Sequence, residues 1–141
     1  MSGYRELQEA YERNHQATIQ RRFLTRDALN GIRTALLARL GINDQASEVV
    51  LWNSPHGGEL YPRLALLELK DVLRARGAIA LRASSEAPAV SLPFDVQFEY
   101  CQEKVVVTVE SAQPKTINGE MDLVDIANGI YELLLLRLST Y

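Results

Sequence analysis

The segment from Gly119 to Tyr141 limits what this chain can fold into more than any other part of its sequence. Asn118 can cap a helix here, and acidic residues come early, where the positive end of a helix dipole favours carboxylates. Four consecutive leucines then turn through about 300° of a helix, so they cover nearly all of its sides. A helix that is apolar all round must be covered by its own domain or by another chain. The leucines that this argument selects as interface candidates are Leu133, Leu134, Leu135, Leu136 and Leu138.

The same segment is close to the length that spans a membrane, but charged and polar residues interrupt it. These residues are Glu120, Asp122, Asp125, Asn128, Glu132 and Arg137. We therefore expect a buried or interface helix in a soluble protein that has no membrane contact. The single cysteine, Cys101, excludes an internal disulfide, and the polar N-terminus has no apolar leader, so we expect a cytoplasmic protein.

Composition predicts an ordinary globular protein with an uneven charge. With 141 residues, of which 47% are hydrophobic and 23% charged, the chain can bury a real core without metals or disulfides. Residues 1–40 hold seven arginines against four acidic residues, whereas the remainder of the chain is acidic. This asymmetry favours contact between copies or with an acidic partner, and ordinary solvated charge is the alternative.

The N-terminal region predicts helix of two different characters. From Thr25, a plausible N-cap, an amphipathic helix carries the stripe of Leu29, Ile32, Leu36 and Leu40 and stops at Gly41. Residues 1–24 are expected to form a polar, arginine-containing helical arm, and residues 25–141 a single α+β domain. One continuous helix over residues 4–40 would be about 55 Å long, which exceeds the size of such a domain. On the arm, Tyr4, Leu7 and Tyr11 share one face and are further interface candidates.

The middle of the chain reads as strand, helix and strand. Residues 48–52 are typical of a short buried strand, and Pro62 suits the first turn of a helix. The spacing of Leu66, Leu69, Leu73 and Arg76 continues that helix, and Gly77 ends it. Residues 78–83 are expected to form the next strand. The strand-helix-strand unit over residues 48–83 therefore predicts a right-handed crossover. Residues 84–93 are expected to form a loop.

The clearest strand signal is a hairpin over residues 93–101 and 104–111. Apolar and polar residues alternate in the first strand, and pairing Cys101 with Lys104 places Tyr100, Phe98 and Val96 opposite valines on one face. Gln102-Glu103 is not a favoured two-residue turn, so a longer loop is the alternative. The whole chain therefore predicts an α+β fold in the order α-β-α-β-β-β-α, with a sheet of about four strands covered by helices.

The loop after the first strand is the best candidate for a ligand site. His56 can act as an acid or base, Gly57 and Gly58 can bring backbone N–H groups close to an anion, and Trp52 lies beside them in sequence. No phosphate loop, dinucleotide fingerprint or nucleophile elbow accompanies them, so a surface turn is the alternative. His15 is the only other histidine and shares no short motif with His56, so neither a metal site nor a cofactor is expected.

The arginines of the first predicted helix suggest nucleic-acid binding as a hypothesis. Arg21, Arg22 and Arg26 can contact phosphates, and Tyr4 and Tyr11 upstream can stack on bases. The pI of about 5.4 and the lack of a nucleic-acid motif argue against this interpretation. Pairing of the arginines with the acidic part of a neighbouring subunit is the more economical one.

Three functions of different classes remain open. The sequence favours a non-catalytic assembly, adaptor or structural subunit that self-associates, or docks in a larger complex, through its helices. The second function is a small ligand-binding protein or enzyme that uses the His56-Gly57-Gly58 loop. The third is a nucleic-acid-associated factor that uses the N-terminal arginines. No motif fixes a reaction, so an enzyme is the less favoured class.

Overall fold

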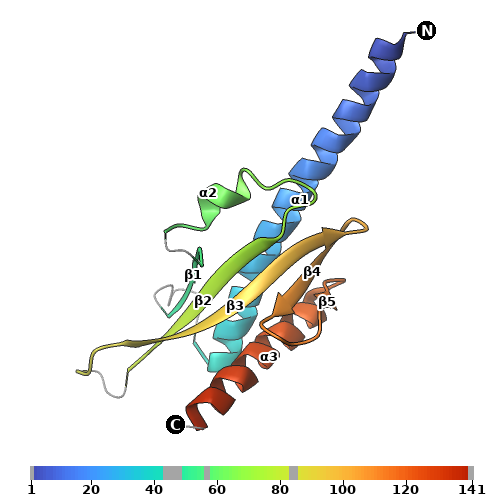
Figure 1. Ribbon diagram of the computed structural model, residues 1–141. Coiled ribbons are helices and arrows are strands. Elements are labelled where there is room, and N and C mark those ends of the chain that lie inside the picture. The colour runs from blue at the N-terminus through green and yellow to red at the C-terminus, as the bar shows by residue number, and fades with distance from the viewer. Residues whose placement is uncertain (1, 43–48, 56–57, 83–85, 140–141) are drawn as a thin grey trace.

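The computed structural model describes residues 2–42, 49–55, 58–82 and 86–139. It contains a five-stranded antiparallel sheet with two long helices against one face (Figure 1). The elements are α1 (Gly3–Leu40), β1 (Val50–Asn53), α2 (Tyr61–Leu64), β2 (Leu73–Leu81), β3 (Val90–Cys101), β4 (Lys104–Val109), β5 (Lys115–Thr116) and α3 (Glu120–Ser139). The predicted α+β class and the helix-covered sheet are confirmed. The sheet has five strands because the two-residue β5 adds a short edge.

Helix α1 is one continuous helix of 38 residues, about 57 Å long at 1.5 Å per residue. It exceeds the domain because its N-terminal part extends beyond the sheet (Figure 1). The predicted N-cap at Thr25 is wrong, since Thr25 is buried within the helix and its hydroxyl donates to the Arg21 carbonyl at 2.8 Å. The helix begins instead at Ser2, whose Oγ accepts from the Arg5 N–H. The predicted stop at Gly41 is confirmed, with the glycine in the left-handed region at φ 76°.

The strands form a simple meander in the order β1-β2-β3-β4-β5, with all neighbours antiparallel. The predicted right-handed crossover between the first two strands is therefore wrong. Val50 pairs with Ile79 and Asn53 with Arg76, so β1 and β2 run in opposite directions. The described part of the first predicted strand is shifted, because β1 starts at Val50, and residues 43–48 lie outside the described residues.

The predicted helix from Pro62 to Arg76 is also wrong, since α2 ends at Leu64 and β2 begins at Leu73. The backbone carbonyls of Glu68 and Asp71 accept hydrogen bonds from the Arg21 guanidinium, and the Glu68 carbonyl also accepts from the Asp71 N–H at 3.2 Å in a single turn that does not continue as a helix. Beyond them, burial alternates residue by residue along β2, which is the period of a strand. Tertiary contacts therefore override the helical spacing of the leucines in this segment.

Gly77, expected to end a helix, lies in the middle of β2 opposite Phe94 of β3. A Cβ atom built on Gly77 would lie 2.2 Å from the far end of the Phe94 ring. The glycine thus lets the aromatic ring lie directly over the backbone of the neighbouring strand. Strand β3 starts at Val90, so the end of the predicted 84–93 loop is strand as well.

The predicted hairpin register is confirmed residue by residue. Cys101 pairs with Lys104, and Tyr100, Phe98 and Val96 face Val105, Val107 and Val109. The connection is the tight two-residue turn, in which Gln102 and Glu103 adopt φ angles of 51° and 65°. Both residues therefore occupy the left-handed region that asparagine and glycine tolerate better.

The double substitution Gln102→Asn/Glu103→Gly is expected to raise the free energy of unfolding by about 1 kcal/mol, because it relieves two left-handed side-chain conformations. Chemical denaturation followed by circular dichroism measures the change. Glu103→Ala is the control and should give no gain, since alanine keeps the Cβ atom. A double variant less stable than the parent would contradict this account of the turn.

The core lies between the inner face of the sheet and the two long helices. In α1 the predicted stripe is confirmed, with Leu29, Ile32 and Leu36 fully buried and Leu40 half-buried. Helix α3 contributes Ile126, Ala127, Ile130 and Leu134. The outer face of the sheet carries exposed polar residues such as Arg74, Arg76, Asp95 and Glu99. None of the described helices is long and apolar enough to cross a membrane.

Candidate functional site

The part of α1 that extends past the sheet presents apolar side chains to solvent. We call residues 3–17 the projecting segment (Figure 1). Tyr4, Leu7 and Tyr11 are 74%, 71% and 67% exposed, and the Tyr11 ring stacks on His15 at 5.8 Å between centroids. The helix does not break at residue 24, and Thr18 and Arg21, within the predicted arm, are buried against the domain.

The three exposed side chains continue a face of α1 that is buried further along. At 100° per residue they lie within about 60° of one another and on the same side as Thr18 and Thr25. The charged residues of the projecting segment all lie on the other half of the helix, at least about 120° from Thr18. They are Arg5, Glu6, Glu9, Glu12 and Arg13. One half of the projecting segment is therefore free of charged residues and suited to burial.

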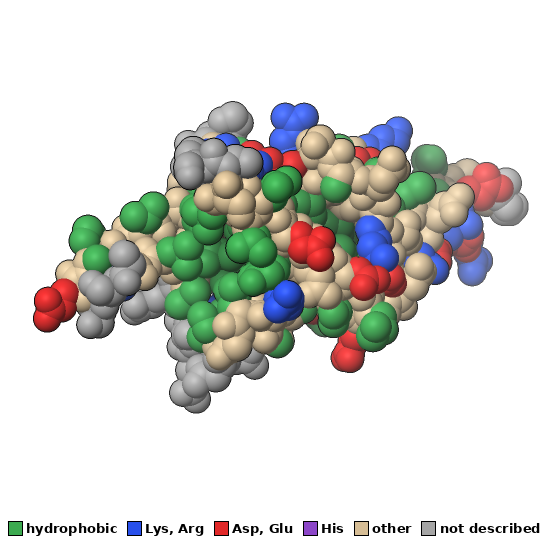
Figure 2. All heavy atoms as spheres, turned by 90° about the horizontal axis from the view of Figure 1, so that it is seen from below, with side chains coloured by type: hydrophobic (Ala, Val, Ile, Leu, Met, Phe, Trp, Pro, Cys, Tyr) green, Lys and Arg blue, Asp and Glu red, His purple; other side chains and the backbone are tan. Residues whose placement is uncertain are grey.

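The predicted interface leucines of α3 have different environments. Leu134 is buried at 4% exposure, and Leu133 is half-buried. Leu135, Leu136 and Leu138 are 50%, 64% and 43% exposed. Figure 2 views the end of the molecule at which α1 and α3 finish and shows hydrophobic side chains gathered near the middle of that face. The domain's own core therefore covers one side of α3 and leaves apolar surface on the others.

A groove of about 410 Å³ follows one side of α3, against the turn between β4 and β5. Leu133 and Leu136 line it from the helix, and Val107 and Val109 from the sheet. Its rim carries Glu110, Lys115, Asp125 and Glu132. The groove is an apolar surface feature and has the shape of a packing site rather than a closed ligand pocket.

The structure describes only part of the predicted ligand loop. His56 and Gly57 lie outside the described residues. Trp52 points into the core, where its Nε1–H donates to the Leu29 carbonyl at 3.1 Å and its ring packs edge-on against Phe94 and Phe98. The Gly58 carbonyl accepts from the Ser54 N–H at 3.2 Å. Among the described loop residues, Trp52 is therefore a core residue directed away from any ligand.

Arg21 is a buried structural residue, a role that the sequence analysis missed. Its Nη1 donates to the Glu68 carbonyl at 2.6 Å, and its Nη2 donates to the carbonyls of Asp71 and Phe98 at 2.6 and 3.2 Å. Burial lowers the pKa of the Arg21 guanidinium, and the negative charge of Asp71 opposes this shift. The guanidinium fork thus attaches the loop before β2 to both α1 and β3.

The other two arginines selected as phosphate contacts also have partners within the chain. Arg22 Nε donates to the Leu67 carbonyl at 2.8 Å, and its guanidinium lies 3.6 Å from a Glu68 carboxylate oxygen. Arg26 is exposed and lies over the Phe23 ring, 5.1 Å from its centroid. Arg22 and Arg26 both line a hollow between α1 and α2, whereas the buried Arg21 does not share that surface.

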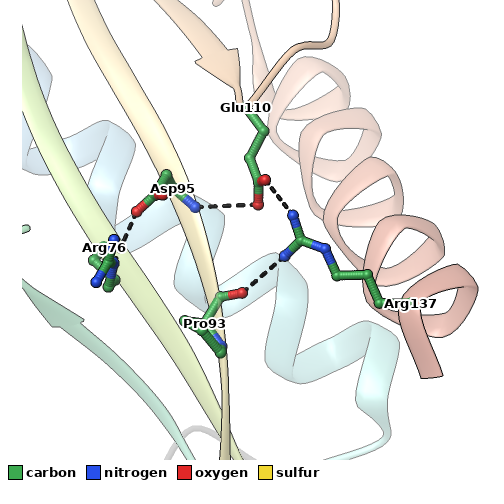
Figure 3. Close-up of polar contacts among 5 residues, drawn as sticks. All are labelled: Arg76, Pro93, Asp95, Glu110 and Arg137. Carbon is green, nitrogen blue, oxygen red and sulfur yellow. Dashed lines mark hydrogen bonds and ion pairs between the residues drawn. The ribbon is translucent and has the colours of Figure 1, made fainter. Parts of the chain in front are cut away.

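A chain of ion pairs and hydrogen bonds joins the C-terminal end of α3 to the sheet (Figure 3). Arg137 pairs with Glu110, which follows β4, and also donates to the Pro93 carbonyl of β3 at 3.0 Å. Glu110 in turn accepts from the Asp95 N–H, and the Asp95 carboxylate pairs with Arg76 of β2 at 2.9 Å. These contacts fix α3 on the sheet, so the sides of the helix that face solvent are held in a defined orientation.

The first turn of α3 is capped by Asp122 rather than by Asn118. The Asp122 carboxylate accepts from the N–H groups of Asn118 and Gly119 at 2.7 and 3.2 Å, as the third helical residue of a capping box does. The hydrogen bond from the Asn118 N–H lowers the pKa of Asp122 from its usual 3.8. Lys115 lies 3.7 Å from Asp122 and 3.0 Å from Asp125, so these two carboxylates share a lysine of the same chain.

Asp122→Asn is expected to lower the melting temperature at neutral pH, because the variant loses the charged acceptor at the helix terminus. A carboxyl whose pKa is lowered by folding stabilises the native state at higher pH and stops doing so as the pH falls through its folded pKa. The gap to the parent should therefore begin to narrow below about pH 3.8, the ordinary value, and close as the pH falls through the lower folded pKa. Melting curves across pH, with Glu132→Gln as the control, test this, and a gap that persists in acid would refute it.

Among the described residues, no group of three or more histidine, cysteine, aspartate or glutamate side chains could hold a metal ion. The fold is a two-layer α+β sandwich whose unusual features are its exposed helical surfaces. No family model, curated protein sequence or solved structure matches this chain. These exposed helical surfaces are therefore the features from which a function can be inferred.

Proposed function

We propose that this protein is a non-catalytic assembly subunit that self-associates through its helices, and that the projecting segment of α1 docks on another copy. The observation that carries the proposal is the charge-free half of this segment, with Tyr4, Leu7 and Tyr11 more than two thirds exposed. A folded chain gains nothing by itself from sorting charged residues to one side of a helix that solvent surrounds. The sorting is useful when the uncharged half is buried in a contact.

Two further features support the same proposal. The C-terminal half of α3, which carries the exposed leucines, lies at the opposite end of the molecule from the projecting segment (Figure 1). Two separate apolar surfaces allow one contact to close a symmetric pair and the other to join pairs or dock them in a larger complex. The lone thiol of Cys101 is exposed, which suits the reducing cytoplasm where we place this subunit.

The experiment compares sedimentation of the parent with that of Leu7→Glu/Tyr11→Glu. Both side chains are exposed and lie beyond the sheet, so the variant should fold and keep its melting temperature. We expect it to form smaller assemblies than the parent, because each copy then buries two charges at the contact. The matched control, Gln16→Glu/Gln20→Glu, adds the same charges to the opposite half of α1 and should behave as the parent. A Leu7/Tyr11 variant that sediments as the parent does would overturn the docking role of this segment.

A further inference from the structure

The hollow between α1 and α2 combines arginines with exposed aromatic rings, and its volume is about 410 Å³ (Figure 1). One wall is a strip of α1 whose residues are three or four positions apart and therefore share a side of the helix. The other wall comes from α2. The lining residues that matter here are Ile19, Arg22, Phe23, Arg26, Tyr61 and Leu64.

The charge of this hollow is positive. Arg22 and Arg26 line it, and none of the described lining residues is acidic. Arg22 is held in place, because its Nε donates to the Leu67 carbonyl at 2.8 Å and its Nη2 lies 3.6 Å from a Glu68 carboxylate oxygen. Glu68 is not itself part of the lining. The hollow therefore suits a ligand that carries negative charge.

Arg26 has its hydrogen-bond donors available. Its guanidinium lies over the Phe23 ring, 5.1 Å from the centroid. Because Phe23 follows Arg22 directly in sequence, this contact turns the Arg26 guanidinium back along α1 toward Arg22. No residue in the described ranges gives Arg26 a hydrogen bond or an ion pair. One arginine is thus fixed by the fold, and the second lies beside it with free N–H groups.

We infer that this hollow binds a free nucleoside monophosphate, with its phosphate on Arg22 and Arg26 and its base on the ring of Tyr61. A phosphate monoester carries a charge of about −1.5 to −2 at neutral pH, which matches two guanidinium groups better than a single carboxylate does. Guanidinium forks also fit the oxygens of a phosphate geometrically. The volume lies within the range of about 300–1,000 Å³ that is usual for ligand sites.

The rest of the lining suits an aromatic base. Tyr61 and Phe23 are 49% and 54% exposed, and Ile19 adds apolar surface beside them. A half-exposed ring gives a base a face on which to stack, whichever base it is. The lining has no amide or carboxylate side chain that could read the edge of a base. AMP and GMP should therefore bind with dissociation constants that agree within about threefold.

The surroundings favour a free nucleotide over a nucleic-acid strand. A single strand needs a positively charged groove that continues beyond one nucleotide. Over the three turns before Ile19, the same side of α1 carries Gln8, Glu12 and His15, without an arginine. The chain as a whole has a net charge of −3. The positive surface is therefore about one nucleotide long.

The first test is calorimetric titration of the full-length protein with AMP, adenosine and inorganic phosphate. AMP should bind with a dissociation constant on the order of 0.1 mM, since the hollow is open to solvent. Adenosine and inorganic phosphate should each bind at least about tenfold more weakly, because each makes only part of the contacts. Absence of AMP binding, or phosphate that binds as tightly as AMP, would overturn the inference.

The second test uses variants of the hollow. Arg26→Gln should weaken AMP binding by about tenfold or more, and it should fold because Arg26 is exposed. Arg74→Gln is the matched control, an exposed arginine on the outer face of the sheet, and should bind as the parent does. Tyr61→Ser should weaken binding, whereas Tyr61→Phe should keep it. Unchanged melting temperatures establish folding, and an Arg26→Gln variant that binds AMP like the parent would contradict the site.

The third test separates the two sources of this chemistry. A short single-stranded oligo(dA) with a 5′-phosphate should bind no more tightly than AMP, since only its terminal nucleotide fits the hollow. An oligonucleotide that binds more than about tenfold more tightly than AMP, and loses this affinity in Arg26→Gln, would overturn the free nucleotide in favour of a strand. Sedimentation of the parent is read separately, because the nucleotide site does not require self-association.

Discussion

Arg21→Met is expected to lower the free energy of unfolding by about 3 kcal/mol or more. The substitution removes three hydrogen bonds to the carbonyls of Glu68, Asp71 and Phe98. Methionine fills much of the same channel, so the loss measures unpaired carbonyls rather than an empty cavity. A buried carbonyl that loses its partner costs about 1–3 kcal/mol, and the contact with the Phe98 carbonyl is buried while those with Glu68 and Asp71 are part-buried, so the three losses together account for the expected change.

Two companion variants make this measurement specific. Arg26→Met lies in the same helix but at an exposed position, and it should change stability by less than about 0.5 kcal/mol. Arg21→Lys should recover only part of the loss, because an ammonium lacks the planar fork that reaches several carbonyls together. Equilibrium denaturation of the variants provides the comparison. Equal stability of Arg21→Met and Arg26→Met would show that the loop before β2 is held by other contacts.

Leu134→Glu is expected to prevent stable folding, whereas Leu135→Glu is expected to leave the fold intact. Leu134 is 4% exposed and packs in the core, so a glutamate there loses apolar burial and buries a charge. The combined cost is at least about 4 kcal/mol, a large part of the stability of a typical domain. Leu135 is 50% exposed, so its replacement changes the outer surface of α3.

Circular dichroism and the emission of the buried Trp52 report the difference between these adjacent positions. Comparing the two single variants distinguishes the core leucine from the surface leucine. A double variant could not distinguish them, because loss of the fold would hide any effect on the surface. A folded Leu134→Glu variant, or an unfolded Leu135→Glu variant, would contradict the orientation of α3.

The hairpin was predictable because two independent signals agreed. Alternation in β3 and the run of valines in β4 select the same register, and a shift by one residue would turn every side chain to the wrong face. The two-residue turn was not predictable from propensity, since Gln102 and Glu103 are poor choices for positive φ. The strand pairing determines the turn here, at a local cost in backbone strain.

The errors in the middle of the chain arise from contacts between distant residues. Leu66, Leu69 and Leu73 have helical spacing, but Arg21 binds the carbonyls between them from 47 and 50 residues away. Likewise, Thr25 resembles an N-cap in sequence, although its hydroxyl also suits the interior of a helix by donating to the carbonyl four residues earlier. The spacing of residues along the sequence indicates neither the Arg21 contacts nor the choice made by the Thr25 hydroxyl.

The sequence predicted that both terminal helices expose apolar side chains, but not which residues of α3 are exposed. Exposure of Tyr4, Leu7 and Tyr11 matches the expectation of a helix with little core contact. The run of leucines could not be divided into core and surface positions, because four consecutive leucines cover nearly all sides of α3 and the sequence does not say which side the sheet covers. Met121 and Val124, which are 71% and 41% exposed, were missed as further apolar surface of α3.

Self-association of this chain can be measured by light scattering of the 141-residue protein across a concentration series. We expect a mass that rises with concentration from 15.8 kDa to at least twice that value. A mass that stays at 15.8 kDa at every concentration would show that the chain does not self-associate.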